Sequence, residues 1–430
     1  MSTEDKEPIR KPVEPRKEGQ LSDLLVIDLS RAVAGPHAAM MLGDLGARVI
    51  KVERPGQGDE ARTWGPPFVA GTDGQRVSTY FLAANRNKES ITLDLKDTKD
   101  MAQLRQLLVK ADVLIENFRP GTLTRLGLTD QALMSLNPRL IVLEISGFGH
   151  DGPEGDRPGY DQIAQGEAGL MSVTGSNPDD PQRVGVPIAD LLAGAYGAYG
   201  VLAALHERNR TGHGQIVRTS LLAAVVASHG YQGTAWTVAG VRGQARGNHH
   251  PSIVPYGLFR CGEGAVQIAC GNDAQWQKLS TEFGLDFDAD LATNPQRVER
   301  RADVVRLLED AFSSLTTAEV LARLDAVGVP AGRVRSIDEV YAWEQTRSQR
   351  LIVDVQHSSL GPIQLPGPAL RFFDIDDDRE IETTRQHHDP PPLLGADNAN
   401  LESWLHNRNH GDEQTADRPS PVSADDQGAS

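Results

Sequence analysis

A strand–helix–strand pattern near the start of the chain constrains the fold most. The apolar run LLVIDL (24–29) is followed by AGPHAAMMLGDLG, whose apolar residues recur at helical spacing until Gly46, and RVIKVE (48–53) then reads as a strand. A strand, a helix and a strand within about thirty residues form a βαβ unit, which requires parallel strands and a right-handed crossover. The pattern therefore predicts an open, parallel α/β sheet.

The same alternation continues along the first half of the chain. Further strands are predicted at 90–95, 112–118 and 140–148, with helices near 98–110 and 129–135. Ligands of open α/β sheets bind beyond the carboxyl ends of the strands. The loops at those ends comprise residues 30–36, 53–58, 117–121 and 147–153. A ligand site is expected among these loops.

Changes in composition along the chain suggest its domain boundaries. Residues 21–225 are expected to form the large domain, 226–340 a connector and a small domain with strands at YGLFR and AVQIAC, and 341–406 a return onto the large domain. VPAGRV (329–334) is taken as the start of a connector, and 205–250 as a long linking segment.

Both ends of the chain lack core-forming residues. Residues 1–20 are expected to be a disordered arm and 407–430 a disordered acidic tail. The low-charge stretch 188–205 is interrupted by Asp190 and rich in Ala and Gly, so it is expected to be a packed helix and not a membrane span.

Charge and cysteine content narrow the possible partners and compartment. The chain of 430 residues has a formal net charge of −16 and a pI near 5.2, which disfavours nucleic acid and anionic membranes as partners. Its two cysteines exclude a disulfide scaffold and a Cys-rich metal site, and favour a cytoplasmic location. The paired histidines of GNHHPSIVPYG have no accompanying metal motif, so no metal site is expected.

Charged residues at the strand ends allow two interpretations. Glu53 follows the second strand at the place of a ribose-binding acid, but the first βα turn lacks GxGxxG, which disfavours an NAD enzyme. A solvent-facing Glu53 is as plausible. The pairs Lys51 with Arg54, and Arg119 with Arg125, are more typical of solvated surface charges, although their position favours an anion modestly.

Asp190 precedes an apolar stretch rich in small residues. Asp is a favoured helix N-cap, so a structural cap is the simpler interpretation from the residues alone. A carboxylate at a helix N-terminus is also stabilised as the anion, which would keep it available as a nucleophile. The small residues Ala193, Gly194, Ala195 and Gly197 would let another backbone or a ligand approach.

Five segments in order resemble the class III CoA-transferases, with acyl-CoA racemases as relatives. They are LSRAVAGPHAAMMLGDLGARVIKVERPGQGD, NRNKESITLDLK, ENFRPGTLTRLGL, RPGYDQIAQ and VGVPIADLLAG, and the resemblance runs from Leu21 to Leu401. It implies a Rossmann-like large domain, a smaller α+β domain and an interlocked homodimer. It also implies a CoA thioester as substrate, with no permanently bound cofactor.

The resemblance also assigns site residues. Asp190 matches the catalytic aspartate, and Asp161 in RPGYD matches an acidic site position with a role in positioning or proton handling. The matched CoA-binding positions are Val33, Ala34, Arg54, Leu93, Asn117, Phe118, Arg125 and Leu126. Arg54 and Arg125 would supply positive charge for the CoA phosphates.

The substrate positions favour one branch of the family. Tyr160 stands where the racemases carry a histidine, and a phenol with a pKa of about 10 is poorly suited to α-proton exchange at neutral pH. GNHHPSIVPYG replaces the glycine-rich loop of formyl-CoA transferases and resembles the succinyl-CoA-dependent dicarboxylate transferases. His249, His250 and Ser252 would then hold the distal carboxylate of the substrate, and a purely structural loop is equally open.

The expected function is therefore transfer of CoA from an acyl-CoA donor to a carboxylic acid acceptor. The alternatives are an acyl-CoA racemase or epimerase, a formyl-CoA:oxalate-type transferase, and a catalytically silent CoA-binding protein.

Overall fold

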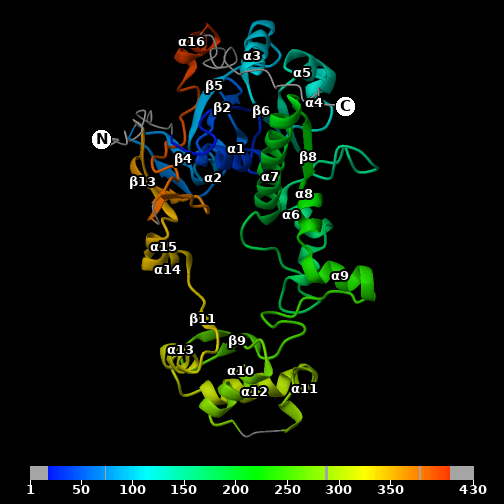
Figure 1. Cartoon of the computed structure of the whole chain (residues 1–430), viewed down its shortest axis with the longest axis vertical. Helices are drawn as coiled ribbons and strands as arrows, with labels where there is room; N and C mark the ends of the chain where they lie inside the picture. The colour runs from blue at the N-terminus through cyan, green and yellow to red at the C-terminus, as the bar shows by residue number, and fades with distance from the viewer. Residues whose placement is uncertain (1–17, 73, 286–288, 377–378, 407–430) are drawn as a thin grey trace, which may run out of the picture.

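The computed structural model describes residues 18–72, 74–285, 289–376 and 379–406. The predicted tail and most of the predicted N-terminal arm lie outside these ranges. Figure 1 shows an elongated chain, with a large sheet and its helices at one end and a small sheet with its helices at the other, joined by two extended segments.

The large sheet has six parallel strands in the order β5-β2-β1-β6-β7-β8. Their bounds are β1 Leu25–Asp28, β2 Arg48–Glu53, β5 Lys88–Thr92, β6 Val113–Glu116, β7 Ile141–Ser146 and β8 Ile216–Ser220. The predicted open parallel sheet is confirmed. Because strand order reverses beside β1, a crevice for a ligand is expected where β1 and β6 end.

Strand β8 was not predicted. It lies inside 205–250, which the sequence suggested was a linking segment, and it pairs with β7 as the last strand of the sheet. The charged Arg218 at its centre hides the strand pattern. In the folded chain Arg218 pairs with Glu144 of β7 and with Asp130.

Helices cover both faces of the sheet. One face carries α1 (Ala34–Asp44), α6 (Asp161–Glu167), α7 (Ile188–Thr211) and α8 (Leu221–Ala227), and the other carries α3 (Thr98–Lys110) and α5 (Asp130–Leu136). Short elements nearby are α2 (Thr79–Ala84), α4 (Thr122–Arg125) and the β3–β4 hairpin (Phe68–Ala70, Arg76–Ser78). The two apolar cores hold the loops at the strand ends in place.

Helix α7 is packed closely by its glycines. A Cβ on Gly194 would lie 2.7 Å from the Ala34 carbonyl oxygen of α1, and one on Gly197 would lie 2.9 Å from a Leu143 methyl of β7. The predicted close approach of another backbone to α7 is therefore found. By length and hydropathy alone α7 is a candidate membrane span, with 44% of its apolar window buried within the chain.

The small sheet is antiparallel, with strand order β11-β10-β9. β9 (Tyr256–Arg260) and β10 (Ala265–Ala269) lie at the predicted strands. VPAGRV does not begin a connector, because β11 (Ala331–Arg333) lies within it and completes this sheet. Helices α10 (Asp273–Glu282), α11 (Asn294–Glu299), α12 (Arg301–Phe312) and α13 (Thr317–Ala326) close a separate apolar core.

The last segment contacts the large sheet again. Asp397 accepts a hydrogen bond from the Ser90 amide of β5, and the Pro392 carbonyl accepts from Arg62. The elements that follow β11 in the chain are α14 (Ile337–Ala342), α15 (Glu344–Ser348), β12 (Ile352–His357), β13 (Gly361–Pro366), β14 (Phe373–Asp376), β15 (Arg379–Glu382) and α16 (Leu401–His406). Helix α9 (Gly230–Ala239) stands beside the other connecting segment.

Candidate active site

Asp190 lies in the first turn of α7, but it is not the N-cap that its sequence context suggested. The helix begins at Ile188, so Asp190 is its third residue, and the cap position is Pro187, whose side chain makes no cap hydrogen bond. The Asp190 carboxylate therefore does not cap the helix, and the structural interpretation that competed with a catalytic role does not apply.

Asp161 caps α7 in place of the missing side chain. Asp161 is the first residue of α6, and its Oδ1 accepts hydrogen bonds from the backbone amides of Ala189 (2.8 Å) and Asp190 (3.4 Å). Gln165, fully buried, donates to Asp161 Oδ2 (2.7 Å) and accepts from the Val184 amide (2.8 Å). Asp161 is therefore placed to orient the turn that carries Asp190.

The environment of Asp190 disfavours its charged form. Burial, and secondarily the nearby Asp161 carboxylate, raise the pKa of Asp190 from 3.8 to about 7. This differs from the expectation that the helix N-terminus would keep Asp190 readily ionised. The free N–H groups of α7 next to it are occupied by Asp161, and the added negative charge opposes ionisation.

The first turn of α1 lies close to Asp190. Asp190 and Gly194 are four residues apart and so share one face of α7. Gly194 is in near contact with the Ala34 carbonyl and the His37 ring of α1. Burial, with Arg86 nearby, lowers the pKa of His37 to about 4, so this ring is neutral. Val33 and Ala34 are thereby brought to the same region as Asp190.

Asn117 fastens the turn after β1 to the end of β6. Its Oδ1 accepts from the Arg31 amide (2.8 Å) and its Nδ2 donates to the Arg31 carbonyl (2.7 Å). The Arg31 guanidinium also stacks over Phe118, 5.4 Å from the ring centroid. These contacts of Arg31 with Asn117 and Phe118 connect β1 and β6 where the strand order reverses. In such a sheet the ligand crevice is expected at this point.

Comparison with known proteins identifies the family. Residues 21–398 match the family described as CoA-transferase family III. This chain belongs to CoA-transferase family III. Human succinyl-CoA:glutarate CoA-transferase is 37% identical over 378 residues, covering 87% of this chain and 83% of the human protein. Succinate–glutarate CoA-transferase of Agrobacterium fabrum is 39% identical over 391 residues, covering 90% and 96%.

A solved structure agrees with this assignment. A CaiB/BaiF family protein from Brucella suis has a TM-score of 0.78 and 37% identity, covering 90% of this chain and all of that one. The predicted membership of a CoA-transferase family, and with it transferase activity on CoA thioesters, is confirmed.

The remaining family-matched CoA positions differ in exposure. Arg54 and Arg125 are exposed, and Arg125 donates to the Thr122 hydroxyl (2.8 Å). Leu126 is half-buried, while Leu93 is only 2% exposed and belongs to the apolar core beneath β5. A coenzyme could meet Leu93 chiefly through its backbone.

The histidine loop forms its own cluster beside the small sheet. His250 stacks on Tyr256 (5.1 Å) and accepts from the Ser252 amide, while Arg301 donates to the His250 carbonyl. Burial, and then Arg301, lower the pKa values of His249 and His250, which favours the neutral form of both rings.

Within the described ranges, no hydrogen bond or ring contact joins this loop to Asp161 or Asp190. Tyr160, by contrast, adjoins Asp161 directly, and its side chain is 59% exposed. Within the described part of the chain, Tyr160 therefore adjoins the candidate catalytic pair, whereas the histidine loop makes no direct polar contact with it.

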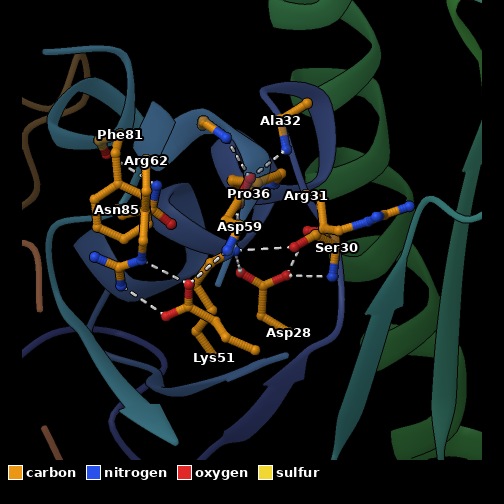
Figure 2. Close-up of polar contacts among 12 residues, drawn as sticks. Asp28, Ser30, Arg31, Ala32, Pro36, Lys51, Asp59, Arg62, Phe81 and Asn85 are labelled. Carbon is orange, nitrogen blue, oxygen red and sulfur yellow. Dashed lines mark hydrogen bonds and ion pairs between the residues drawn. The ribbon is translucent and has the colours of Figure 1, made fainter. Parts of the chain in front are cut away.

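Two charged residues for which the sequence allowed a solvent-facing position are buried. Lys51 is fully buried between Asp28 and Asp59 (Figure 2). Glu53 is 4% exposed and binds Arg62 through both oxygens, so it is neither a solvated charge nor a ribose ligand. Their partners lie on other segments, which is why the local sequence gave no sign of burial.

A cleft of about 750 Å³ opens over the ends of β6, β7 and β8 and does not include Asp190. Glu116, Glu144 and His150 in it lie close enough to share a metal ion. However, Arg218 already pairs with Glu144, and burial raises the pKa of Glu116 to about 8. The cluster is thus neutralised by protons and Arg218.

Proposed function

We propose that this family III transferase moves CoA from succinyl-CoA, or another dicarboxylyl-CoA, to a carboxylic acid acceptor, with Asp190 as the nucleophile. The observation that carries the assignment is the placement of Asp190, oriented by Asp161 and next to the first turn of α1. The names of the relatives in human and Agrobacterium fabrum support succinyl-CoA as donor.

The proposed reaction proceeds through two kinds of covalent intermediate. The Asp190 carboxylate attacks the thioester carbonyl, forming a mixed anhydride and releasing the CoA thiolate. The thiolate then attacks the aspartyl carbonyl, forming an Asp190–CoA thioester and releasing the donor acid. The acceptor carboxylate attacks this thioester to give a second anhydride, and the thiolate attacks its acyl carbonyl, which yields the new acyl-CoA and free Asp190.

The N-terminus of α1 suits the charges that develop in these steps. The first N–H groups of a helix have no partners within it, so they can stabilise oxyanions and thiolate near Asp190. Arg54 and Arg125 are exposed and available to the phosphates of CoA, which an acidic chain must bind through local positive charge.

A second copy of the chain would complete the site in this proposal. Helix α7 exposes Tyr196 and Tyr199 (40% and 71%), and α9 exposes Trp236 and Val238 (57% and 80%). Exposed aromatic side chains such as these are enriched at protein interfaces. In a dimer the histidine loop of one chain would meet Asp190 of the other, and His249, His250 and Ser252 would receive the distal carboxylate.

Mass spectrometry of the intact protein tests the proposal. After incubation with succinyl-CoA, we expect an adduct of CoA that hydroxylamine removes and that peptide mapping assigns to Asp190. The Asp190→Asn variant should bind CoA without forming the adduct. Absence of any adduct with succinyl-CoA and with other acyl-CoA thioesters, together with deuterium incorporation at the α-carbon of a branched acyl-CoA, would favour a racemase instead.

A further inference from the structure

The turn that leads from β1 into the first turn of α1, residues 30–36, has a conformation that its own sequence does not favour. Ala32 has φ of +66°, in the left-handed region that residues with a Cβ rarely adopt. Val33 and Ala34 follow immediately, and the turn ends at Pro36, the third residue of α1. A turn of this kind persists only when surrounding contacts hold it.

Buried charges hold the start and the middle of the turn (Figure 2). The Lys51 ammonium donates to the Ser30 carbonyl (2.9 Å) and pairs with Asp59 Oδ2 (2.9 Å). Asp59 Oδ1 in turn accepts from the Ala32 amide (3.0 Å). The amide of Ser30 donates to Asp28 Oδ1 (2.9 Å). The strained residue is therefore fixed by Asp59, and Asp59 is fixed by Lys51.

A second lysine holds the far end of the turn. Lys88 of β5 donates to the Pro36 carbonyl (2.9 Å), to Asp28 Oδ2 (2.9 Å) and to Asn85 Oδ1 (2.9 Å). Asp28, Lys51 and Lys88 come from the three neighbouring strands β1, β2 and β5. Two aspartates and two lysines, whose charges are equal and opposite, thus form a cluster that makes hydrogen bonds to the backbone at both ends of the turn and in its middle.

Burying these four charged side chains costs desolvation free energy that offsets much of what their ion pairs contribute to the stability of the fold. The side chains of Lys51, Lys88, Asp28 and Asp59 are 0% exposed, and buried ion pairs are often no more stabilising than apolar residues of similar volume. What apolar side chains could not do is bind the carbonyls of Ser30 and Pro36 and the amide of Ala32. The geometry therefore serves the conformation of the turn.

We propose that Lys51 and Asp59 are positioning residues, which hold the turn at Ala32 so that Val33, Ala34 and the start of α1 meet the coenzyme and the thioester carbonyl at Asp190. This inference rests on the proposed function. Neither residue touches the reacting atoms in this proposal, since both are buried beneath the turn.

The test compares two matched pairs of substitutions in the full-length protein. Lys51→Met with Asp59→Ala removes one ion pair of the cluster and leaves Asp28 paired with Lys88, so that no lone buried charge remains. The control, Asp44→Ala with Arg86→Met, removes another buried ion pair at the opposite end of α1. Thermal unfolding of both variants shows how much stability each loses, and amide hydrogen exchange over residues 31–36 reports the turn without any ligand.

Three readouts are expected to separate positioning from mere stability. In the Lys51/Asp59 variant, exchange at residues 31–36 rises, the Kd for CoA and the KM for acyl-CoA rise, and kcat/KM falls about 10²-fold, the loss expected from misplacement of reacting groups by about 1 Å. The control keeps its Kd and KM within about twofold while losing as much or more stability.

Two results overturn the proposal, and they differ from failure of the proposed function. Unchanged exchange at residues 31–36, or CoA binding and kcat/KM equal to those of the control, would show that the cluster does not position the turn. Failure of the wild-type protein to bind CoA or to form the Asp190 adduct would instead refute the proposed function, and this inference with it.

Discussion

Replacing Asp190 with asparagine is expected to abolish transfer and, at the same time, to stabilise the protein. The raised pKa of Asp190 means that the folded chain holds its proton up to about pH 7, whereas the unfolded chain loses it near 3.8. Between these values the folded state binds more protons, so stability falls as pH rises and then levels off above pH 7. A neutral side chain at this position avoids that loss.

The size of the effect follows from the pKa shift. A change from 3.8 to about 7 is worth roughly 4 kcal/mol at about 1.4 kcal/mol per pKa unit. Because Asp190 is only half-buried, partial solvation lowers this to about 2–4 kcal/mol at pH 8. At pH 5, where the folded chain keeps its proton, the same arithmetic gives less than about 2 kcal/mol.

Thermal unfolding of wild type and Asp190→Asn at pH 5 and pH 8 measures this difference. We expect the Tm of the variant to exceed that of wild type by roughly 4–16 °C at pH 8, at about 2–4 °C per kcal/mol for units of 150–250 residues. The gain should be clearly smaller at pH 5. The control Asp325→Asn, at an exposed position of α13, should change Tm little at either pH. A variant that is destabilised at pH 8, or whose gain is the same at both pH values, would refute the reasoning.

Three further substitutions test the site and its surroundings. Asp161→Asn keeps an oxygen acceptor for the Ala189 amide and removes the charge that, after burial, contributes to the raised pKa of Asp190. The acidic limb of the pH profile of kcat/KM should therefore move to lower pH, and an unmoved limb would contradict the electrostatic role of Asp161. Gly194→Ala places a Cβ 2.7 Å from the Ala34 carbonyl oxygen and should cost about 1–3 kcal/mol of stability. Gly185→Ala, where a Cβ meets nothing within 4 Å, is its control, and equal Tm values for the two variants would contradict the close packing. Tyr199→Lys, at a side chain that is 71% exposed, should convert the proposed dimer to monomer in light scattering without preventing folding; a dimer of unchanged stability would place the interface elsewhere.

The parallel sheet could be predicted because β1, β6 and β7 are largely apolar runs bounded by turn residues. β8 was missed because Arg218 is satisfied by Glu144 and Asp130, which are 74 and 88 residues away in the chain. The burial of Lys51 and Glu53 was missed for the same reason. A buried charge is recognisable only together with its partners, and these lie on other strands and loops.

The proposed catalytic position, Asp190, was reached through resemblance, since the local sequence pattern favoured a helix cap there. The structure assigns the capping to Asp161, which is 28 residues before Ala189 in the chain and belongs to a different helix. Residue spacing within a single helix cannot predict a contact between two helices. Gln165, which holds Asp161, was quoted within RPGYDQIAQ, but its role follows only from the packing of α6 against α7.

The arrangement of the two aspartates bears directly on the chemistry. The repulsion between Asp161 and Asp190 exists while Asp190 is a free carboxylate, and it disappears once Asp190 is acylated, since the anhydride and the thioester carry no charge at that position. A carboxylate whose charge is disfavoured is also the more basic and therefore the more nucleophilic one. The contact that aligns the first turn of α7 thus also favours the proposed covalent intermediates over the resting carboxylate. Asp161 would serve both purposes with one side chain, because its Oδ1 binds the backbone amides while its charge acts on Asp190.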